Sequence, residues 1–134
     1  MPPKGYQHLI VWQKSKDLAV QIYKISNDGK LSKDFGLRDQ MRRSAVSVPS
    51  NIAEGDERDT DRESIRFFYV AKGSLAELRT QLQIAHEIGY LDDNTFNNLN
   101  QASNTVANML GKLIKARSAP KPIGPTPTPL APSP

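Results

Sequence analysis

The sequence predicts an all-α fold, an up-down-up-down four-helix bundle followed by a disordered, proline-rich C-terminal tail. Four segments repeat apolar residues at intervals of three and four, which places them on one helix face, and no segment alternates like a strand. Short connections separate the segments, so consecutive helices are expected to be antiparallel. The chain has 134 residues, enough for one domain. We divide it into an N-terminal extension, a bundle and a tail: residues 1–8, 9–118 and 119–134.

The first two predicted helices cover residues 9–26 and 36–54. The first is followed by Gly29, which suits a left-handed helix cap because it has no Cβ. Pro49 falls inside the apolar pattern of the second helix, where it removes one backbone hydrogen bond and is expected to kink the helix. Gly55 is expected to end this helix.

The last two predicted helices cover residues 61–88 and 93–116. Thr60 and Glu63 have the spacing of a capping box, in which each side chain bonds a free amide of the first turn. Asp92 is a favourable N-cap for the final helix, because its carboxylate accepts hydrogen bonds from amides that have no partner within the helix. The local sequence therefore predicts where both helices begin.

Two groups of small or polar residues are predicted at helix contacts. One group follows a flank of the second helix at steps of four and three, and we call it the polar seam. It is either a solvated face or a contact with another helix or subunit. The other group surrounds a glycine inside the third helix, where a second backbone is expected to approach closely. The polar seam contains Gln40, Ser44, Ser47, Asn51 and Glu54, and the second group is centred on Gly73 and Ser74.

Charge is arranged in three blocks of +4, −4 and +4 over residues 1–55, 56–93 and 94–134, for a net charge of +4. Three interpretations fit this arrangement: a mixed solvated surface, attraction of another copy of the chain, or a basic face that binds nucleic acid. Phosphate binding requires several cations on one surface, and Arg42 and Arg43 are our first choices. The full set of candidate nucleic-acid-binding residues is Lys14, Lys16, Arg38, Arg42, Arg43, Lys112, Lys115 and Arg117.

The sequence does not predict an enzyme. Its only histidines, His8 and His86, are assigned ordinary surface or boundary roles, and the chain has no cysteine. No glycine-rich phosphate loop and no supported Ser/His/Asp arrangement is present. The acidic segment 56–61 lacks the central glycine of a calcium-binding loop, which favours a solvated, dipole-compensating role. We predict no catalytic residue, no metal site and no cofactor.

The chain contains no apolar run near the ~20 residues that a membrane span needs and no signal peptide, so we expect a cytoplasmic protein. Seven of the ten prolines lie within residues 120–134, which carry a single charged side chain. Such a segment buries too little apolar surface to fold. It is either an inert tail or a ligand for a polyproline-binding partner, since two proline pairs have PxxP spacing.

Two segments resemble the signatures of the 23S rRNA-intervening sequence proteins. Residues 40–55 read Q-M-R-R-S-A-V-S-V-P-S-N-I-A-E-G and are similar to Q-x-R-R-A-x-x-S-I-P-x-N-I-A-E-G. Residues 67–78 read F-F-Y-V-A-K-G-S-L-A-E-L and are similar to F-x-x-x-A-x-G-S-x-x-E-L. The likeness covers nearly all of residues 8–117, but Arg79 stands where an acidic residue is common in the family.

The resemblance implies a four-helix bundle that assembles as a homopentameric, barrel-like ring. A related bundle, the accessory protein of diversity-generating retroelements, is thought to contact a reverse transcriptase and nucleic acid. Together with the basic residues, the resemblance indicates a non-enzymatic oligomer that binds structured RNA or other nucleic acid through basic patches, in association with ribosomal RNA. The alternative is a structural or protein-docking scaffold without nucleic-acid binding. The expected partners are the chain itself, RNA or DNA, or another protein, and not a membrane.

Overall fold

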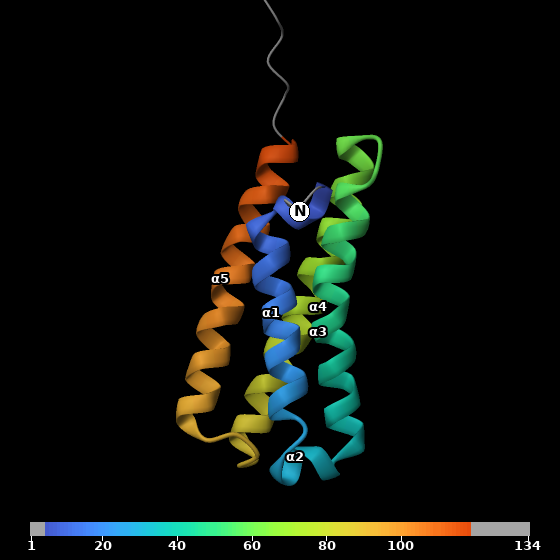
Figure 1. The fold of residues 1–134 in the computed structure, drawn as a ribbon. Helices are drawn as coiled ribbons and strands as arrows, with labels where there is room; N and C mark the ends of the chain where they lie inside the picture. Colours follow the sequence, from blue (N-terminus) through green and yellow to red (C-terminus); the bar gives the residue numbers. More distant parts are fainter. Residues whose placement is uncertain (1–4, 119–134) are drawn as a thin grey trace, which may run out of the picture.

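The computed structural model describes residues 5–118 (Figure 1). Four long helices make up most of this part of the chain, and no strand occurs within it. The predicted tail and residues 1–4 of the predicted extension lie outside the described residues. The elements are η1 (Gly5–His8, a 3-10 helix), α1 (Ile10–Ile25), α2 (Gly29–Lys33), α3 (Phe35–Asp56), α4 (Asp61–Glu87) and α5 (Asp93–Ser118).

The four long helices run alternately in opposite directions and form a closed bundle (Figure 1). Helix α3 packs against α1 and α4, and α5 packs against α4 and α1. The start of α1, the turn between α3 and α4 and the end of α5 therefore share one end of the bundle, while α2 lies at the other. The predicted up-down-up-down four-helix bundle is confirmed.

Each predicted helix begins and ends within two residues of an observed one. The predicted caps are present at two helix starts: the Thr60 hydroxyl accepts a hydrogen bond from the Glu63 amide at 3.2 Å, and the Asp92 carboxylate accepts one from the Thr95 amide at 2.7 Å. The backbone and side-chain hydrogen bonds from Thr95 lower the pKa of Asp92 below its ordinary value, because they stabilise the ionised carboxylate.

The short helix α2 was not predicted. Its Leu31 is buried, and the residue that follows the helix, Asp34, caps α3 by accepting a hydrogen bond from the Leu37 amide at 3.1 Å. The Tyr90 hydroxyl, from the turn between α4 and α5, donates to the second oxygen of Asp34 at 3.0 Å. That hydrogen bond is the largest cause of a raised pKa of Tyr90, and burial and the charge of the Asp34 carboxylate raise this pKa further. Gly29 has the expected left-handed conformation, with a φ of +64°, but it begins α2 and does not cap α1, whose C-cap is Ser26.

The core consists of the apolar stripes that the four long helices turn toward the bundle axis. Burying one such side chain contributes about 1.5–3 kcal/mol, so these stripes supply the main driving force for folding. The largest fully buried side chains are Phe68, Leu18, Ile22, Leu31, Met41, Ile52, Leu75, Leu78, Leu82, Leu110, Val48 and Val106.

The structure gives Gly55 a different role from the predicted helix cap. Helix α3 continues past Pro49 and Gly55 to Asp56, so neither residue ends it. A Cβ atom on Gly55 would lie 2.6 Å from the Phe68 ring and 2.9 Å from the Ser64 carbonyl oxygen of α4. The close approach of two helices within the chain therefore occurs at Gly55. The position of a Cβ on Gly73, by contrast, has nothing within 4 Å.

We expect Gly55→Ala to lower the free energy of unfolding by about 2–3 kcal/mol, because the added methyl group forces α3 and α4 apart in a close-packed interior. The measurement is urea unfolding followed by circular dichroism. Gly111→Ala is the matched control, since Gly111 is also helical and has nothing within 4 Å of its Cβ position. It should be neutral or stabilise by up to about 1 kcal/mol. Equal stability of the two variants would contradict the assigned role of Gly55.

Candidate nucleic-acid interface

The middle of the polar seam lies between α3 and α4. The hydroxyl oxygens of Ser47 and Ser74 are 2.7 Å apart, and the Asn51 amide donates to the Ser47 carbonyl at 2.8 Å and to its hydroxyl at 3.0 Å. Ser44 is buried beside them, although it is polar. The pair of Ser47 and Ser74 forms a helix–helix contact within one chain, whereas the Asn51 bonds stay within α3. A contact with another subunit remains a prediction.

The ends of the polar seam face solvent. Gln40 is exposed near the start of α3, and Glu54 is exposed near its end, where it pairs with Arg58 one turn later. Gly73 is also exposed, so it is not part of the contact that its neighbour Ser74 makes with α3. A partner can therefore contact Gln40, Glu54 and Gly73 only from outside the bundle.

Arg42, one of the two first choices for phosphate contact, is half-buried and is bonded to residues at the end of α1. Its guanidinium donates to the Ser26 hydroxyl at 2.8 Å and to the Asn27 side-chain oxygen at 2.9 Å. It also lies over the Tyr23 ring, 4.7 Å from the centroid. Arg42 thus fastens α3 to the last turn of α1. Arg43, the other first choice, is exposed.

Two further candidate arginines are held in the same way. Arg38 donates to the Ser32 carbonyl at 3.1 Å and pairs with Asp39 at 3.0 Å. Arg117 pairs with Asp56 at 2.8 Å, and this ion pair joins the end of α5 to the end of α3. Both arginines keep only a quarter of their side-chain surface exposed. Each guanidinium therefore already has partners within the chain, which leaves fewer of its five donors for a phosphate.

The lysines among the candidates remain on the surface. Lys14, Lys112 and Lys115 are exposed and make no ion pair within the described residues. Lys16 pairs with Asp17 at 3.1 Å, with about half of each side chain exposed, and a pair of this kind contributes little to stability. The most accessible positive charge among the predicted lysines thus lies on Lys14 of α1 and on Lys112 and Lys115 of α5.

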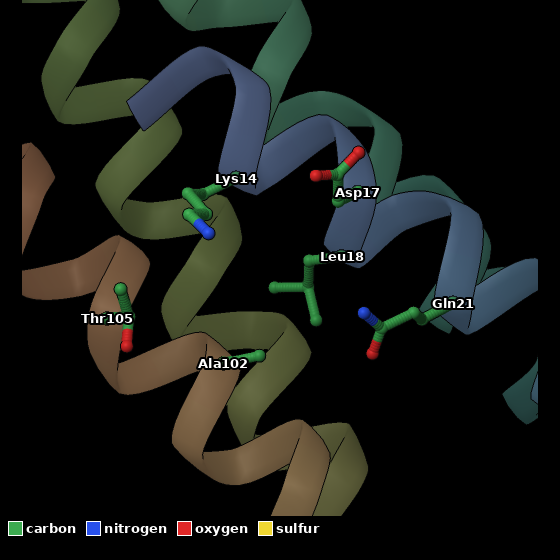
Figure 2. A pocket seen from close by; sticks show the side chains of 6 residues that line it. All are labelled: Lys14, Asp17, Leu18, Gln21, Ala102 and Thr105. Atoms are coloured by element: carbon green, nitrogen blue, oxygen red, sulfur yellow. The ribbon is translucent and has the colours of Figure 1, made fainter. Parts of the chain in front are cut away.

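A small pocket opens between α1 and α5 (Figure 2). Lys14 on α1 and Thr105 on α5 lie on its two walls, with Leu18 between the helices. Its volume of about 200 Å³ is below the roughly 300–1,000 Å³ of typical small-molecule sites. The pocket can accept part of a larger ligand beside Lys14. Its lining residues are Lys14, Asp17, Leu18, Gln21, Ala102 and Thr105.

The histidines and acidic residues of the described chain do not form a metal site. No group of three or more His, Asp or Glu side chains is placed to hold an ion in residues 5–118. His86 is 2.7 Å from the Asp93 carboxylate and stacks on Phe96 at a centroid distance of 4.2 Å, so it joins α4 to the start of α5. In the acidic segment after α3, Asp56 is the partner of Arg117.

Several apolar residues remain on the surface and were not predicted there from the sequence. Val20 and Tyr23 of α1 and Val46 of α3 are more than a third exposed, and with Ala19 and Pro49 they line an apolar groove of about 360 Å³. Helix α4 exposes a second apolar set. A signal was available in the helical spacing, which places Val20 and Val46 away from the buried side chains of α1 and α3. The exposed set on and beside α4 is Tyr69, Val70, Ile84 and Ile88.

Comparisons with known proteins agree with the resemblance seen in the sequence. A family model described as 23S rRNA-intervening sequence protein matches residues 7–112. A solved structure of a protein of unknown function from the S23 ribosomal protein family of Bacteroides thetaiotaomicron is similar, with 25% identity and a TM-score of 0.73. The match covers 79% of this chain and 99% of that one. No curated protein matches the sequence. Within residues 5–118, no helix is long and apolar enough to cross a membrane.

We expect Arg42→Ala to lower the free energy of unfolding by about 2 kcal/mol, because the buried Ser26 hydroxyl loses its donor and two side-chain hydrogen bonds disappear. Arg43→Ala is the matched control on the next residue and should stay within about 0.5 kcal/mol of the parent. Urea unfolding of the three proteins measures both effects. If the two variants are equally stable, Arg42 does not fasten α3 to α1.

Proposed function

The chain belongs to the 23S rRNA-intervening sequence protein family, and we propose that it is a non-enzymatic, oligomeric bundle that binds structured RNA through lysines on its α1–α5 side. The observation that supports this proposal most directly is the position of Lys14, Lys112 and Lys115, which are exposed and have no acidic partner within the described residues. Phosphates attract such free ammonium groups and release counterions on binding. The proposal places this role in the cytoplasm, where ribosomal RNA is found.

Local charge favours the end of α5 over the other basic candidates. After Asp93, no acidic residue occurs in α5. Helix α5 therefore has no carboxylate beside Lys112 and Lys115 that would repel a bound phosphate. The α3–α4 turn at the same end is acidic, but Arg117 neutralises Asp56 there. Arg43 is exposed on α3 and is retained as a secondary contact.

The same proposal includes self-assembly, with a pentameric ring as the resemblance implies. A ring requires two different faces on each copy that fit one another. Exposed apolar side chains occur in two separate places, in the α1–α3 groove and along the outside of α4, and contacts between copies can cover both. Gly73 lies in the middle of the α4 face, and a helical glycine costs about 1 kcal/mol relative to alanine. Close approach of a second copy at this position explains why a glycine stands inside the helix.

A protein-docking oligomer without nucleic-acid binding is the second candidate, and the apolar α1–α3 groove favours it. The two functions differ in their response to salt. Binding through lysines weakens steeply as salt rises, whereas binding through an apolar groove depends on salt only slightly.

We expect Lys112→Gln with Lys115→Gln to weaken binding of a ribosomal RNA fragment at least about tenfold at low salt. The slope of log affinity against log salt should fall by about 2, because two phosphate contacts are lost. Fluorescence anisotropy at several salt concentrations measures both quantities. The control is Lys30→Gln with Lys33→Gln, which removes the same charge from exposed positions on α2 at the opposite end. If both pairs weaken binding equally, only total charge matters and no α5 interface exists.

We expect Gly73→Leu to reduce the oligomer to smaller species, because the added side chain blocks close approach at the α4 face. Folding of the single bundle should be preserved, since nothing lies within 4 Å of the Cβ position. Gly111→Leu, at an equally open helical glycine on α5, is the control and should leave the mass unchanged. Light scattering coupled to size exclusion measures the mass. An unchanged mass for Gly73→Leu would exclude this face from the assembly.

A further inference from the structure

The outer face of α5 carries a row of carboxamide side chains that the basic patch alone does not explain. Five Asn and Gln residues recur at steps of three and four, so they lie on one face of the helix. All five are exposed, and the same face continues into Lys112 and Lys115. We call this the amide row, and it consists of Asn94, Asn97, Gln101, Asn104 and Asn108.

Helix α5 differs from the other three long helices in what it exposes. The large apolar side chains that remain exposed lie on α1, α3 and α4 or just beyond α4, and α5 carries none of them in the described chain. Between Asp93 and Ser118 it also carries no acidic side chain. A face that is neither apolar nor negative is suited to a hydrated, negatively charged ligand. It is also the face least suited to being covered when copies associate through apolar contacts.

The chemistry of the amide row matches a hydroxyl-rich surface. Each carboxamide donates through its NH2 group and accepts through its carbonyl oxygen. The ribose 2′-hydroxyl does both as well, and DNA lacks it. A row of carboxamides beside two ammonium groups can therefore bond sugar hydroxyls while the lysines contact phosphates. Such a surface distinguishes RNA from DNA, which a patch of lysines alone does not.

The shape of the row favours a double helix over a single strand. Binding of single strands relies on aromatic rings that stack on bases, and no aromatic side chain belongs to the amide row. Phe96, the only aromatic residue of α5, is half-buried and stacks on His86. From Asn94 to Lys115 the face extends about 30 Å along a rigid helix. The minor groove of an RNA duplex is wide, shallow and lined with 2′-hydroxyls, so such a face can lie along it.

Contacts with α4 hold the row in place. The Asn104 carboxamide oxygen accepts a hydrogen bond from the Arg79 guanidinium, which directs that oxygen toward α4. At the start of the helix, Asp93 pairs with His86 at 2.7 Å. Arg79, which stands where the family commonly has an acidic residue, thus has a defined role in this chain. It positions a member of the amide row rather than contacting phosphate.

From this arrangement we infer that the amide row, with Lys112 and Lys115, binds the minor groove of double-helical RNA and selects RNA over DNA through the 2′-hydroxyls. The inference rests on the proposed function and adds to it the class of nucleic acid and the residues that select it. A purely solvated helix face is the competing explanation, and it predicts no selection.

The test compares the full chain with the variant N97A/Q101A/N108A. Asn104 is left intact because it bonds Arg79. Alanine favours a helix more than asparagine or glutamine does, so the variant should fold, and circular dichroism verifies this. The probes are a fluorescent RNA duplex and a DNA duplex of the same sequence, each titrated at two salt concentrations. Gln83→Ala, which removes an exposed carboxamide from α4, is the control.

We expect the parent protein to bind the RNA duplex at least about tenfold more tightly than the DNA duplex. The triple variant should lose most of that preference while keeping its affinity for DNA and its salt dependence, because no charge has changed. Gln83→Ala should behave as the parent does. Equal binding of RNA and DNA by the parent, or an unchanged preference in the triple variant, overturns the inference and leaves the proposed function standing. Absence of binding to either duplex at low salt overturns the proposed function and the inference together.

Discussion

The distance between α3 and α4 at Gly55 is the constraint on which the rest of the bundle depends. Phe68 fills the space that a side chain at residue 55 would need, and its ring is completely buried. The guanidinium of Arg117 lies 5.4 Å from the ring centroid and pairs with Asp56. This aromatic ring of α4 therefore contacts both α3 and α5 at the same end. Because the interior is close-packed, this contact also fixes how far α5 lies from α3.

Arginine and lysine have different tasks in this chain. Arg42 joins α3 to α1, Arg117 joins α5 to α3, and Arg79 joins α4 to α5, each through hydrogen bonds to a polar side chain. A guanidinium is suited to such contacts because its planar fork presents five donors and is weakly hydrated. The ammonium groups of Lys112 and Lys115 stay in water. Among the predicted residues, the exposed cations without an acidic partner in the described chain are Lys14, Arg43, Lys112 and Lys115.

The helices could be predicted from the sequence because their causes are local: apolar spacing sets each face, and Thr60 and Asp92 begin two of them. Gly55 and Gly73 show what local reasoning cannot reach. Both are glycines inside helices, yet Gly55 faces an aromatic ring and Gly73 faces open space. This difference depends on residues that are distant in the sequence. For the same reason the sequence placed Arg42 in the candidate interface, although its partners Ser26 and Asn27 lie sixteen and fifteen positions away. The polar seam was recognised, but only the structure divides it into a packed middle and exposed ends.

The surface divides into faces with different physical properties, and this division relates assembly to binding. Apolar side chains remain exposed on α1, α3 and α4, whereas α5 exposes amides and lysines. If copies associate through the apolar faces, every α5 is left in water and faces outward in the same way. A duplex long enough to contact two copies then gains from effective concentration, so a weak single contact suffices for tight binding. Loss of assembly would weaken this binding without touching α5, whereas loss of the amide row would remove the preference for RNA without changing the mass. The two parts of the proposal can therefore be separated experimentally, although tight binding depends on assembly.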